Sequence, residues 1–255
     1  MTEGMSEGVM AAPLTAAQQR RCMGWSARAW LRVWRGVMQA IDQAIDDAGQ
    51  GDWRCESALE VGAGVHSALA PLLLARAQRV ECSALDAATL PVIEQRHAAM
   101  LAPEDAARIS TSVQDVRALR GRWDCIVMKS VLGGLFRMGD ADGVAHMHAL
   151  IRRLRREHLT EGGWLISLDN GRTALEPLFS RFGARRNGWR FFAAGDFPPA
   201  QVACGFGALG AFSAATRLGA VGHAVDDALY ASDCALSPLV QRHAVWGHGW
   251  KAGVE

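Results

Sequence analysis

The stretch Ala58-Leu59-Glu60-Val61-Gly62-Ala63-Gly64-Val65-His66-Ser67 decides how this chain of 255 residues folds. An apolar run ends in an acidic residue, enters a turn with two glycines and continues into a helix-like segment. Glycine suits such a turn because it accepts positive φ and lets a ligand approach the backbone closely. The pattern predicts a strand, a turn and a helix, with a ligand beyond the carboxyl end of the strand.

Short apolar runs alternate with helix-length segments on the carboxyl side of this turn. Such alternation predicts an α/β fold in which right-handed crossovers build a Rossmann-like, doubly wound, mostly parallel sheet with helices on both faces. The predicted strands are residues 57–61, 79–85, 108–113, 125–128 and 164–168, and the predicted helices are residues 67–76, 87–100 and 144–158.

The two ends of the chain flank this predicted core. Residues 16–48 carry an apolar stripe at three- and four-residue steps, which predicts a helix that caps the core or forms part of a lid. We therefore divide the chain into a mobile N-terminus with a helical cap (1–50), a ligand-binding core (51–170) and a C-terminal extension (171–255). Two further strands are expected in the extension, with Gly205-Phe206 as the turn leading into one. The stripe residues are Trp30, Val33, Trp34, Val37, Ile41 and Ile45.

Composition excludes several classes of function. The formal net charge of +1 argues against generic nucleic-acid binding, and no apolar run reaches the roughly 18 residues needed to span a bilayer. The first residues lack a basic start followed by an apolar core, so a cytoplasmic protein is expected. The cysteines show no zinc-ligand spacing, which predicts reduced thiols and no metal site. They are Cys22, Cys55, Cys82, Cys125, Cys204 and Cys234.

The residues around the turn indicate which ligand it accepts. A dinucleotide fingerprint would place a third glycine where Ser67 stands, and no Lys-Ser/Thr pair forms a phosphate loop. The Glu60 carboxylate would repel a pyrophosphate but suits a cationic ligand. Asp86 follows the second predicted strand, where it either accepts ribose hydroxyls or caps the next helix. Asp115 follows the third strand, so three successive strands end near a carboxylate.

This ordered series resembles the class I methyltransferases that use S-adenosylmethionine (SAM). Residues 57–168 carry the resemblance, which covers somewhat under half of the chain. Glu161 stands where the family usually has proline, and the Asn/Asp-Pro-Pro motif of enzymes that methylate base amino groups is missing. The matching segments are Glu60-Val61-Gly62-Ala63-Gly64, Asp86, Asp115, Trp123-Asp124-Cys125-Ile126-Val127-Met128-Lys129-Ser130-Val131-Leu132 and Glu161-Gly162-Gly163-Trp164-Leu165-Ile166.

The resemblance implies SAM as cofactor, S-adenosylhomocysteine (SAH) as product, and a cofactor site in the core. Three segments are similar to those of a bacterial subgroup associated with surface-polysaccharide gene clusters. They are Lys129-Ser130-Val131-Leu132-Gly133-Gly134, Asp169-Asn170-Gly171 and Gly188-Trp189-Arg190-Phe191-Phe192. The implied reaction is O-methylation of a small molecule or glycan hydroxyl. The cofactor-binding residues expected from the matched motifs are Glu60, Gly62, Ala63, Gly64, His66, Asp86, Ala87, Gln114, Asp115, Val116 and Lys129.

Residues at the tips of the fourth and fifth strands are candidates for acting on the acceptor. Lys129 and Asp169 are the predicted catalytic residues, although Lys129 is equally explained as a rim charge and Asp169 as part of a turn. Ser130, Asn170, Trp189 and Arg190 are the predicted acceptor-binding residues. Core packing explains the aromatic cluster around Trp189 equally well.

Three alternatives to this function remain open at the level of sequence. The acceptor could be another small molecule or a protein side chain, or the chain could be a non-catalytic binding or scaffold protein. A nicotinamide-dependent oxidoreductase is disfavoured by Ser67. The sequence predicts no nucleic-acid partner and no membrane span, and it leaves the oligomeric state undetermined.

Overall fold

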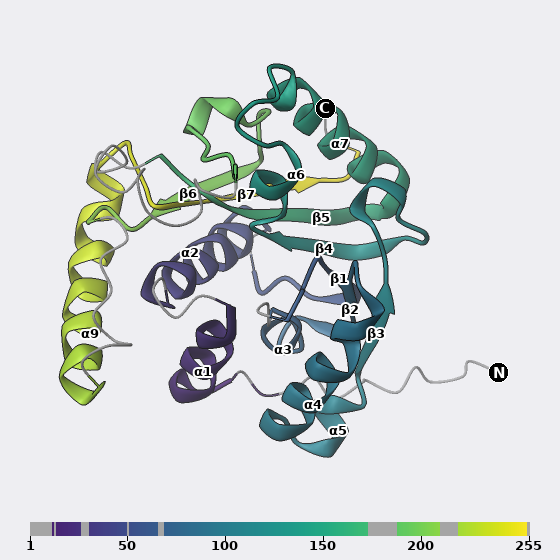
Figure 1. Cartoon of the computed structure of the whole chain (residues 1–255), viewed down its shortest axis with the longest axis horizontal. Helices are drawn as coiled ribbons and strands as arrows, with labels where there is room; N and C mark the ends of the chain where they lie inside the picture. The colour runs from purple at the N-terminus through teal and green to yellow at the C-terminus, as the bar shows by residue number, and fades with distance from the viewer. Residues whose placement is uncertain are drawn as a thin grey trace.

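A twisted sheet forms the centre of the molecule (Figure 1). The computed structural model describes residues 12, 14–26, 31–49, 51–65, 69–172, 188–209 and 219–253. Within these residues the sheet has seven strands in the order β3-β2-β1-β4-β5-β7-β6. They are β1 (Cys55–Val61), β2 (Ala77–Ala84), β3 (Ile109–Val113), β4 (Trp123–Lys129), β5 (Leu159–Asn170), β6 (Val202–Phe206) and β7 (Val245–Lys251).

Strand direction and order confirm the doubly wound α/β fold. β1 pairs in parallel with β2 on one side and β4 on the other, and β7 alone runs antiparallel, between β5 and β6. The chain moves outward from β1 to β3 and then returns to add β4 and β5 on the other side. The order therefore reverses between β1 and β4, where open α/β sheets form a crevice at the carboxyl ends of their strands.

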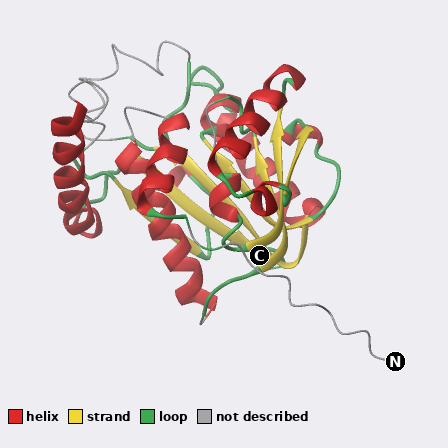
Figure 2. Ribbon diagram, turned by 90° about the horizontal axis from the view of Figure 1, so that it is seen from below, coloured by secondary structure: helices red, strands yellow, loops and turns green. Residues whose placement is uncertain are grey.

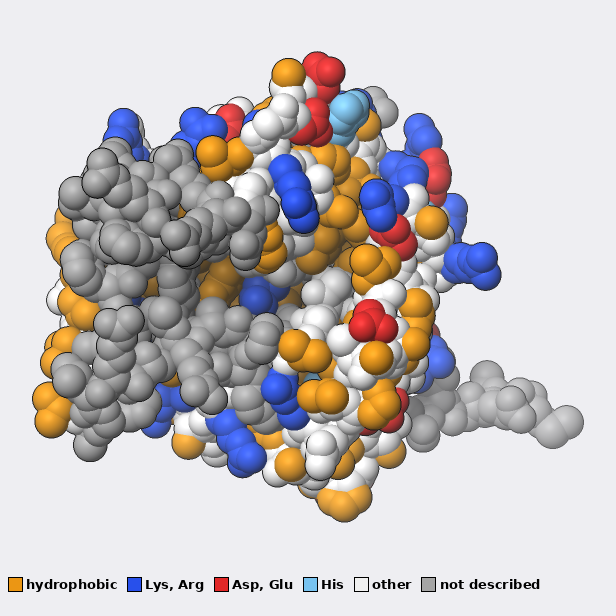
Figure 3. Space-filling model, in the orientation of Figure 1, with side chains coloured by type: hydrophobic (Ala, Val, Ile, Leu, Met, Phe, Trp, Pro, Cys, Tyr) orange, Lys and Arg blue, Asp and Glu red, His pale blue; other side chains and the backbone are white. Residues whose placement is uncertain are grey.

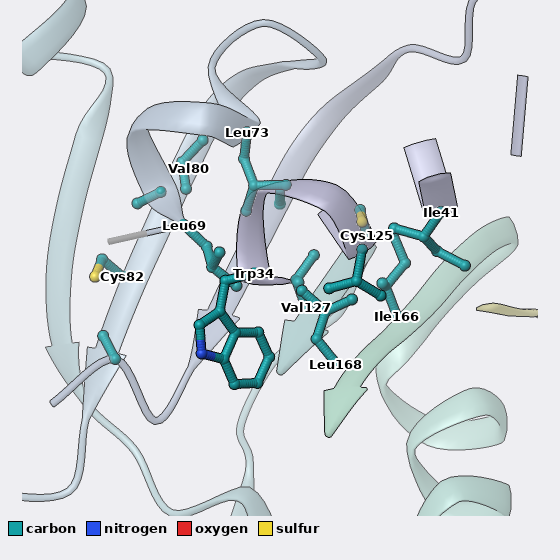
Figure 4. Packing of buried hydrophobic residues seen from close by; sticks show 14 of the residues in the cluster. Trp34, Ile41, Leu69, Leu73, Val80, Cys82, Cys125, Val127, Ile166 and Leu168 are labelled. Atoms are coloured by element: carbon teal, nitrogen blue, oxygen red, sulfur yellow. The ribbon is translucent and has the colours of Figure 1, made fainter. Parts of the chain in front are cut away.

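One face of the sheet is covered by α2 (Leu31–Gly49), α3 (Ala70–Leu73) and α4 (Leu90–Met100), which share a core with β1, β2, β4 and β5. The predicted stripe of α2 packs here, with Val33, Trp34, Val37, Ile41 and Ile45 between 0 and 2% exposed. Figure 4 shows Trp34 beside Val127 and Leu168, with Ile41 to the right, near Cys125 and Ile166. Packing of this helix against the core is thus confirmed, while Trp30 lies outside the described residues.

The opposite face is covered by α6 (Val131–Leu135) and α7 (Gly143–Arg153), which continues as a wider π-type turn at Leu154–His158. Figure 2 shows helices on both sides of the sheet, as a mostly parallel sheet requires. The core of this second layer contains Leu59, Ile126, Met128 and Trp250. Alternate residues of β4 therefore enter opposite layers.

Residues beyond 170 complete the sheet with β6 and β7, joined through α9 (Gly219–Leu236), which lies at the β6 edge in Figure 1. The expected turn at Gly205-Phe206 is wrong, because both residues lie within β6 and pair with Trp246 and Val245. Gly205 serves packing instead, since a Cβ there would collide with the His243 ring. The sequence alone does not distinguish a glycine required by a turn from a glycine required by close packing.

Two predicted helices differ in extent. The helix expected over 16–48 is described as α1 (Ala16–Ser26) and α2, and the helix expected over 67–76 is described only as α3. The segment after β2 opens as a 3₁₀ turn at Ala87–Thr89 before α4, and the short α5 (Pro103–Ala106) precedes β3. The cysteines are free thiols. Among the described residues, no helix is both long and apolar enough to cross a membrane.

Candidate functional site

The glycine turn after β1 leaves open space at the edge of the sheet. Gly62 and Gly64 have φ of +70° and +52°, in the left-handed region that favours glycine. The N–H of Ala63 donates to the Ser83 carbonyl at 2.7 Å, which ties the turn to β2. A Cβ on Gly62 would lie 2.9 Å from Val131, whereas one on Gly64 would meet no described residue within 4 Å. Among the described residues, the turn is therefore held by contacts at Gly62 and Ala63 and leaves space beside Gly64.

Glu60, directly before the turn, is buried and accepts hydrogen bonds from the start of α3. Its side chain is 0% exposed, and its carboxylate accepts the N–H groups of Leu69 at 3.1 Å and Ala70 at 2.8 Å. An acidic group at the start of a helix suits the unpaired N–H groups there. Within the described structure, Glu60 thus acts on the turn through the start of α3. His66, expected to line the cofactor, lies outside the described residues, as does Ser67.

Asp86 lies exposed just beyond β2, together with Ala87. Its Oδ1 accepts the N–H of Ala88 at 2.9 Å, so the capping role expected from the sequence is real. Its Oδ2 has no hydrogen-bond partner among the described residues and remains open to a ligand hydroxyl. The neighbouring Leu85 is 66% exposed, which places an apolar side chain beside the carboxylate.

Gln114 and Asp115, the polar residues predicted to bind the cofactor after β3, already form hydrogen bonds within the protein. Both oxygens of Asp115 accept from the Arg117 guanidinium at 2.7–3.1 Å, and this interaction lowers the pKa of Asp115. The Gln114 amide donates to Glu81 at 2.5 Å, and its oxygen accepts the N–H of Arg120 at 3.1 Å. A ligand can reach these polar groups only by replacing partners inside the protein.

Apolar surface beside these residues is easier for a ligand to reach. Val116 is 4% exposed and packs in the core, whereas Val113 is 52% exposed at the tip of β3. Leu85 directly follows β2, and Val113 is the last residue of the neighbouring strand β3. They offer apolar contact on the same edge as the glycine turn.

Lys129 and Ser130 lie at the reversal point of the sheet. β4 is in register with β1 through Met128 and Val61, so the next residue of each strand, Lys129 and Gly62, emerges at the same place. Ser130 has φ of +56°, and no other described non-glycine residue has positive φ. Such backbone strain is concentrated at functional sites.

The two predicted catalytic side chains emerge on opposite faces of the sheet. Lys129 alternates with Met128 and enters the α2 layer, where its Nζ lies 4.8 Å from the centre of the Trp34 ring. Asp169 alternates with Leu168 and faces α6, accepting the N–H of Gly133 at 3.1 Å. Because side chains alternate along a strand, neighbouring strand ends need not bring these groups together.

Asp169 is a buried carboxyl group. It is 0% exposed, and burial raises its pKa to about 6. The Ser167 hydroxyl donates to its second oxygen, so both oxygens hold protein partners. The geometry gives Asp169 a positioning role at the start of α6. Its action as a general base stays a prediction.

Two of the predicted acceptor-binding residues, Trp189 and Arg190, pack against α6 and the loop that follows it. The Arg190 guanidinium donates to the carbonyls of Phe136 at 2.9 Å and Arg137 at 3.1 Å, so it fastens the loop that follows α6. Trp189 packs near Gly134, and Asn170 is 8% exposed. Arg190 is thus engaged inside the protein, and Trp189 remains half-buried beside α6.

The described side chains on the face shown in Figure 3 carry no single sign of charge. On the face shown in Figure 3, basic side chains are scattered among acidic and apolar ones. Among the described residues, no group of three or more His, Cys, Asp or Glu side chains could hold a metal ion.

Three residues near the site escaped the sequence analysis. Trp34 was assigned to the helical stripe, although its indole reaches the tip of β4 and meets Lys129. Leu85 and Val113 ended predicted strands, and only their exposure reveals them as surface. For Leu85, the one available signal was its position directly before the acidic residue Asp86.

Comparison with known proteins finds similar solved structures but no family. No family model and no curated protein matches the sequence. One similar structure is the glycopeptide N-methyltransferase MtfA complexed with SAM, with 22% identity and a TM-score of 0.39 over 53% of this chain and 56% of MtfA. Another is magnesium protoporphyrin IX methyltransferase (ChlM) from Synechocystis PCC 6803 with bound SAH, with 18% identity and a TM-score of 0.47 over 73% and 75%.

A third similar structure is described as a possible exported protein from Bordetella parapertussis, with 20% identity and a TM-score of 0.42 over 58% of this chain. This chain spans 46% of that protein and 56% of MtfA, about half of each. Likeness at this level assigns neither a cofactor nor a reaction to the chain.

Proposed function

We propose that this chain is a class I SAM-dependent methyltransferase that methylates an oxygen of a small molecule or glycan. The observation that carries the proposal is the open glycine turn at the reversal point between β1 and β4, with the free oxygen of Asp86 on the same edge. Doubly wound sheets bind nucleosides in this crevice, with an acidic residue after the second strand on the ribose.

The residues around the crevice fit a nucleoside with a short amino-acid tail. Gly62, Ala63 and Gly64 let the ligand approach the backbone, and Asp86 would accept from the ribose hydroxyls. Leu85 and Val113 would contact the adenine ring, and Asp115 with Gln114 would meet its edge once Arg117 moves aside. SAM, when bound there, supplies a methyl group on a cationic sulfur.

The acceptor would lie between the strand tips and the wall formed by Trp189 and α6. Ser130 and Asn170 are placed at the tips of β4 and β5, from which they would orient an acceptor hydroxyl. Much of the rate of an in-line displacement comes from such positioning. Asp169 would accept the hydroxyl proton, and its pKa of about 6 leaves it ionised at neutral pH.

A cytoplasmic location is part of the proposal. All six cysteines are free thiols, and reducing compartments keep thiols in this state.

Titration calorimetry with SAH, SAM and NAD tests the cofactor. We expect saturable binding of SAH and SAM and none of NAD. Asp86→Asn keeps a side chain that caps the following turn but loses the carboxylate, so it should bind SAH about tenfold more weakly while unfolding at the same temperature. The exposed Glu104→Gln is the matched control and should bind SAH as the wild type does.

The remaining outcomes separate the alternatives. Binding of NAD alone would identify an oxidoreductase, and a folded protein that binds none of these ligands would favour a scaffold. Unchanged SAH affinity in Asp86→Asn would remove the ribose contact. Acceptor screening with labelled SAM then distinguishes a hydroxyl from a protein side chain.

A further inference from the structure

Lys129 is a cation that forms no ion pair with any described residue. Its Nζ lies over the Trp34 ring at 4.8 Å, and within the described structure no carboxylate approaches it within 4 Å. The chain has 27 lysine and arginine residues, of which only Lys129 and Lys251 are lysines. Lysine carries a compact charge on a flexible stem, which suits a single carboxylate at variable distance.

The two carboxylates that interact electrostatically with Lys129, those of Glu60 and Asp169, form hydrogen bonds with other groups. Glu60 and Asp169 favour its charged form, but burial outweighs them and lowers the pKa of Lys129. The Glu60 carboxylate accepts the N–H groups at the start of α3, and Asp169 faces the other layer of the sheet. Burying a charge without a paired anion is costly. The arrangement is therefore explained best if an anion arrives from outside.

The position of Lys129 defines where that anion binds. Lys129 follows Met128, which pairs with Val61, so it lies beside Gly62 at the reversal point. The Trp34 indole closes the α2 side, and Figure 4 shows it packed beside Val127 and Leu168 at the tips of the central strands. An anion here lies next to the glycine turn and on the β4 side of it, away from Asp86 on the β2 side.

The order of these groups along the sheet edge suits the two ends of the proposed cofactor. The ribose would meet Asp86 beyond β2, and the amino-acid tail would extend past the turn toward β4. The only anionic group of SAM or SAH is the carboxylate at the end of that tail. A nucleoside held at one end of the crevice thus presents its carboxylate at the other.

We propose that Lys129, supported by the Trp34 ring, forms the subsite for the carboxylate of the amino-acid tail of SAM. The inference rests on the proposed function and adds to it the residue pair that recognises the tail. α2 thereby contributes a wall of the cofactor site as well as packing on the core.

Binding of two ligands to two variants tests the subsite. SAH carries the tail, whereas 5′-methylthioadenosine has the same nucleoside and sulfur but no amino-acid tail. Lys129→Met removes the charge and keeps the length of the side chain. We expect it to bind SAH about tenfold more weakly or worse, with methylthioadenosine affinity within about twofold of wild type.

Lys251→Met is the matched control. Lys251 also lies over a tryptophan ring, with its Nζ 5.9 Å from the Trp164 centre. It ends β7 and pairs with Trp164 in a different part of the sheet, so this substitution should leave both affinities unchanged. A thermal melt of each unliganded variant checks folding, and loss of a buried unpaired charge should leave Lys129→Met at least as stable as wild type.

Carbon-13 labelling of lysine provides a readout independent of the variants. Two lysines give two side-chain signals, and Lys129→Met assigns them. SAH should move the Lys129 signal and raise its pKa, because an approaching carboxylate favours the charged form. Methylthioadenosine should leave that pKa unchanged, and Lys251 serves as the internal reference.

The outcomes separate the two proposals. A wild-type protein that binds neither SAH nor methylthioadenosine overturns the methyltransferase proposal itself. Binding of both ligands by wild type, with equal losses or no loss in Lys129→Met, overturns the carboxylate subsite alone. An SAH-specific loss together with the pKa rise supports it.

Discussion

At the scale of single residues, His248 illustrates what burial does to a titratable group. Its ring stacks on Phe197, with centroids 3.9 Å apart, and lies 5.6 Å from the Trp250 ring. No hydrogen-bond partner for its Nδ1 lies among the described residues, and burial lowers its pKa to about 4. The folded protein therefore holds this ring neutral where the unfolded chain would protonate it.

The direction of the resulting pH dependence follows from this shift. Because the unfolded state binds the proton more tightly, the contribution of His248 is present above the unfolded pKa of about 6.5 and is lost as the pH falls toward 4. We expect the free energy of unfolding to fall by about 3 kcal/mol over this interval, measured by urea denaturation. His248→Phe should flatten the profile, whereas substitution of the exposed His146 should not. Parallel profiles for wild type and His248→Phe would contradict the assignment.

At the scale of elements, α9 is attached to α2 through charged groups. Arg32 Nε lies 3.2 Å from Asp233 Oδ2, and both side chains are 0% exposed. Arg35 lies over the Tyr230 ring at 3.9 Å, and the Leu209 N–H donates to Asp233 at 2.9 Å. Burial lowers the pKa of Arg32.

Removing one partner of this pair should be worse than removing both. Arg32→Met leaves Asp233 buried beside an apolar group, and we expect a loss of about 3–5 kcal/mol in the free energy of unfolding. The double variant Arg32→Met/Asp233→Leu should be clearly more stable than the sum of the single losses predicts. Urea denaturation of the four proteins gives the coupling, and strictly additive losses would show that the pair does not hold α9.

At the scale of the whole molecule, the proposed cofactor site draws on elements from most of the chain. The glycine turn comes from the loop after β1, Asp86 from the loop after β2, Lys129 from β4 and Trp34 from α2. A ligand that binds all of these stabilises only the assembled fold. Its binding energy is therefore added to the stability of the whole sheet.

The melting temperature measures this effect. At a hundred times its dissociation constant, SAH should add about 2.7 kcal/mol and raise the melting temperature by about 5–10 °C, as followed by differential scanning fluorimetry. NAD at the same concentration should produce no shift. A bound ligand with no rise in melting temperature would mean that the unfolded chain binds it equally well.

Local patterns in the sequence determined the main elements of the fold. The apolar runs, the turn at Gly62 and Gly64, and the acidic residue after β2 located the first five strands and the open loop. These features depend on neighbours along the chain, because period and turn chemistry act over a few residues. The glycine turn is found where the sequence predicts it, and so is the Asp86 cap.

Only the tertiary structure decided which side chains meet. Lys129 and Asp169 end adjacent strands, yet register and alternation send them to opposite layers. Arg190 and Asp115, both expected to be free for ligands, hold partners within the protein. Trp34, distant in sequence, reaches Lys129 because α2 packs on the face of the sheet that the Lys129 side chain enters. The order of elements follows from local chemistry, whereas the partners of each side chain depend on packing between distant segments.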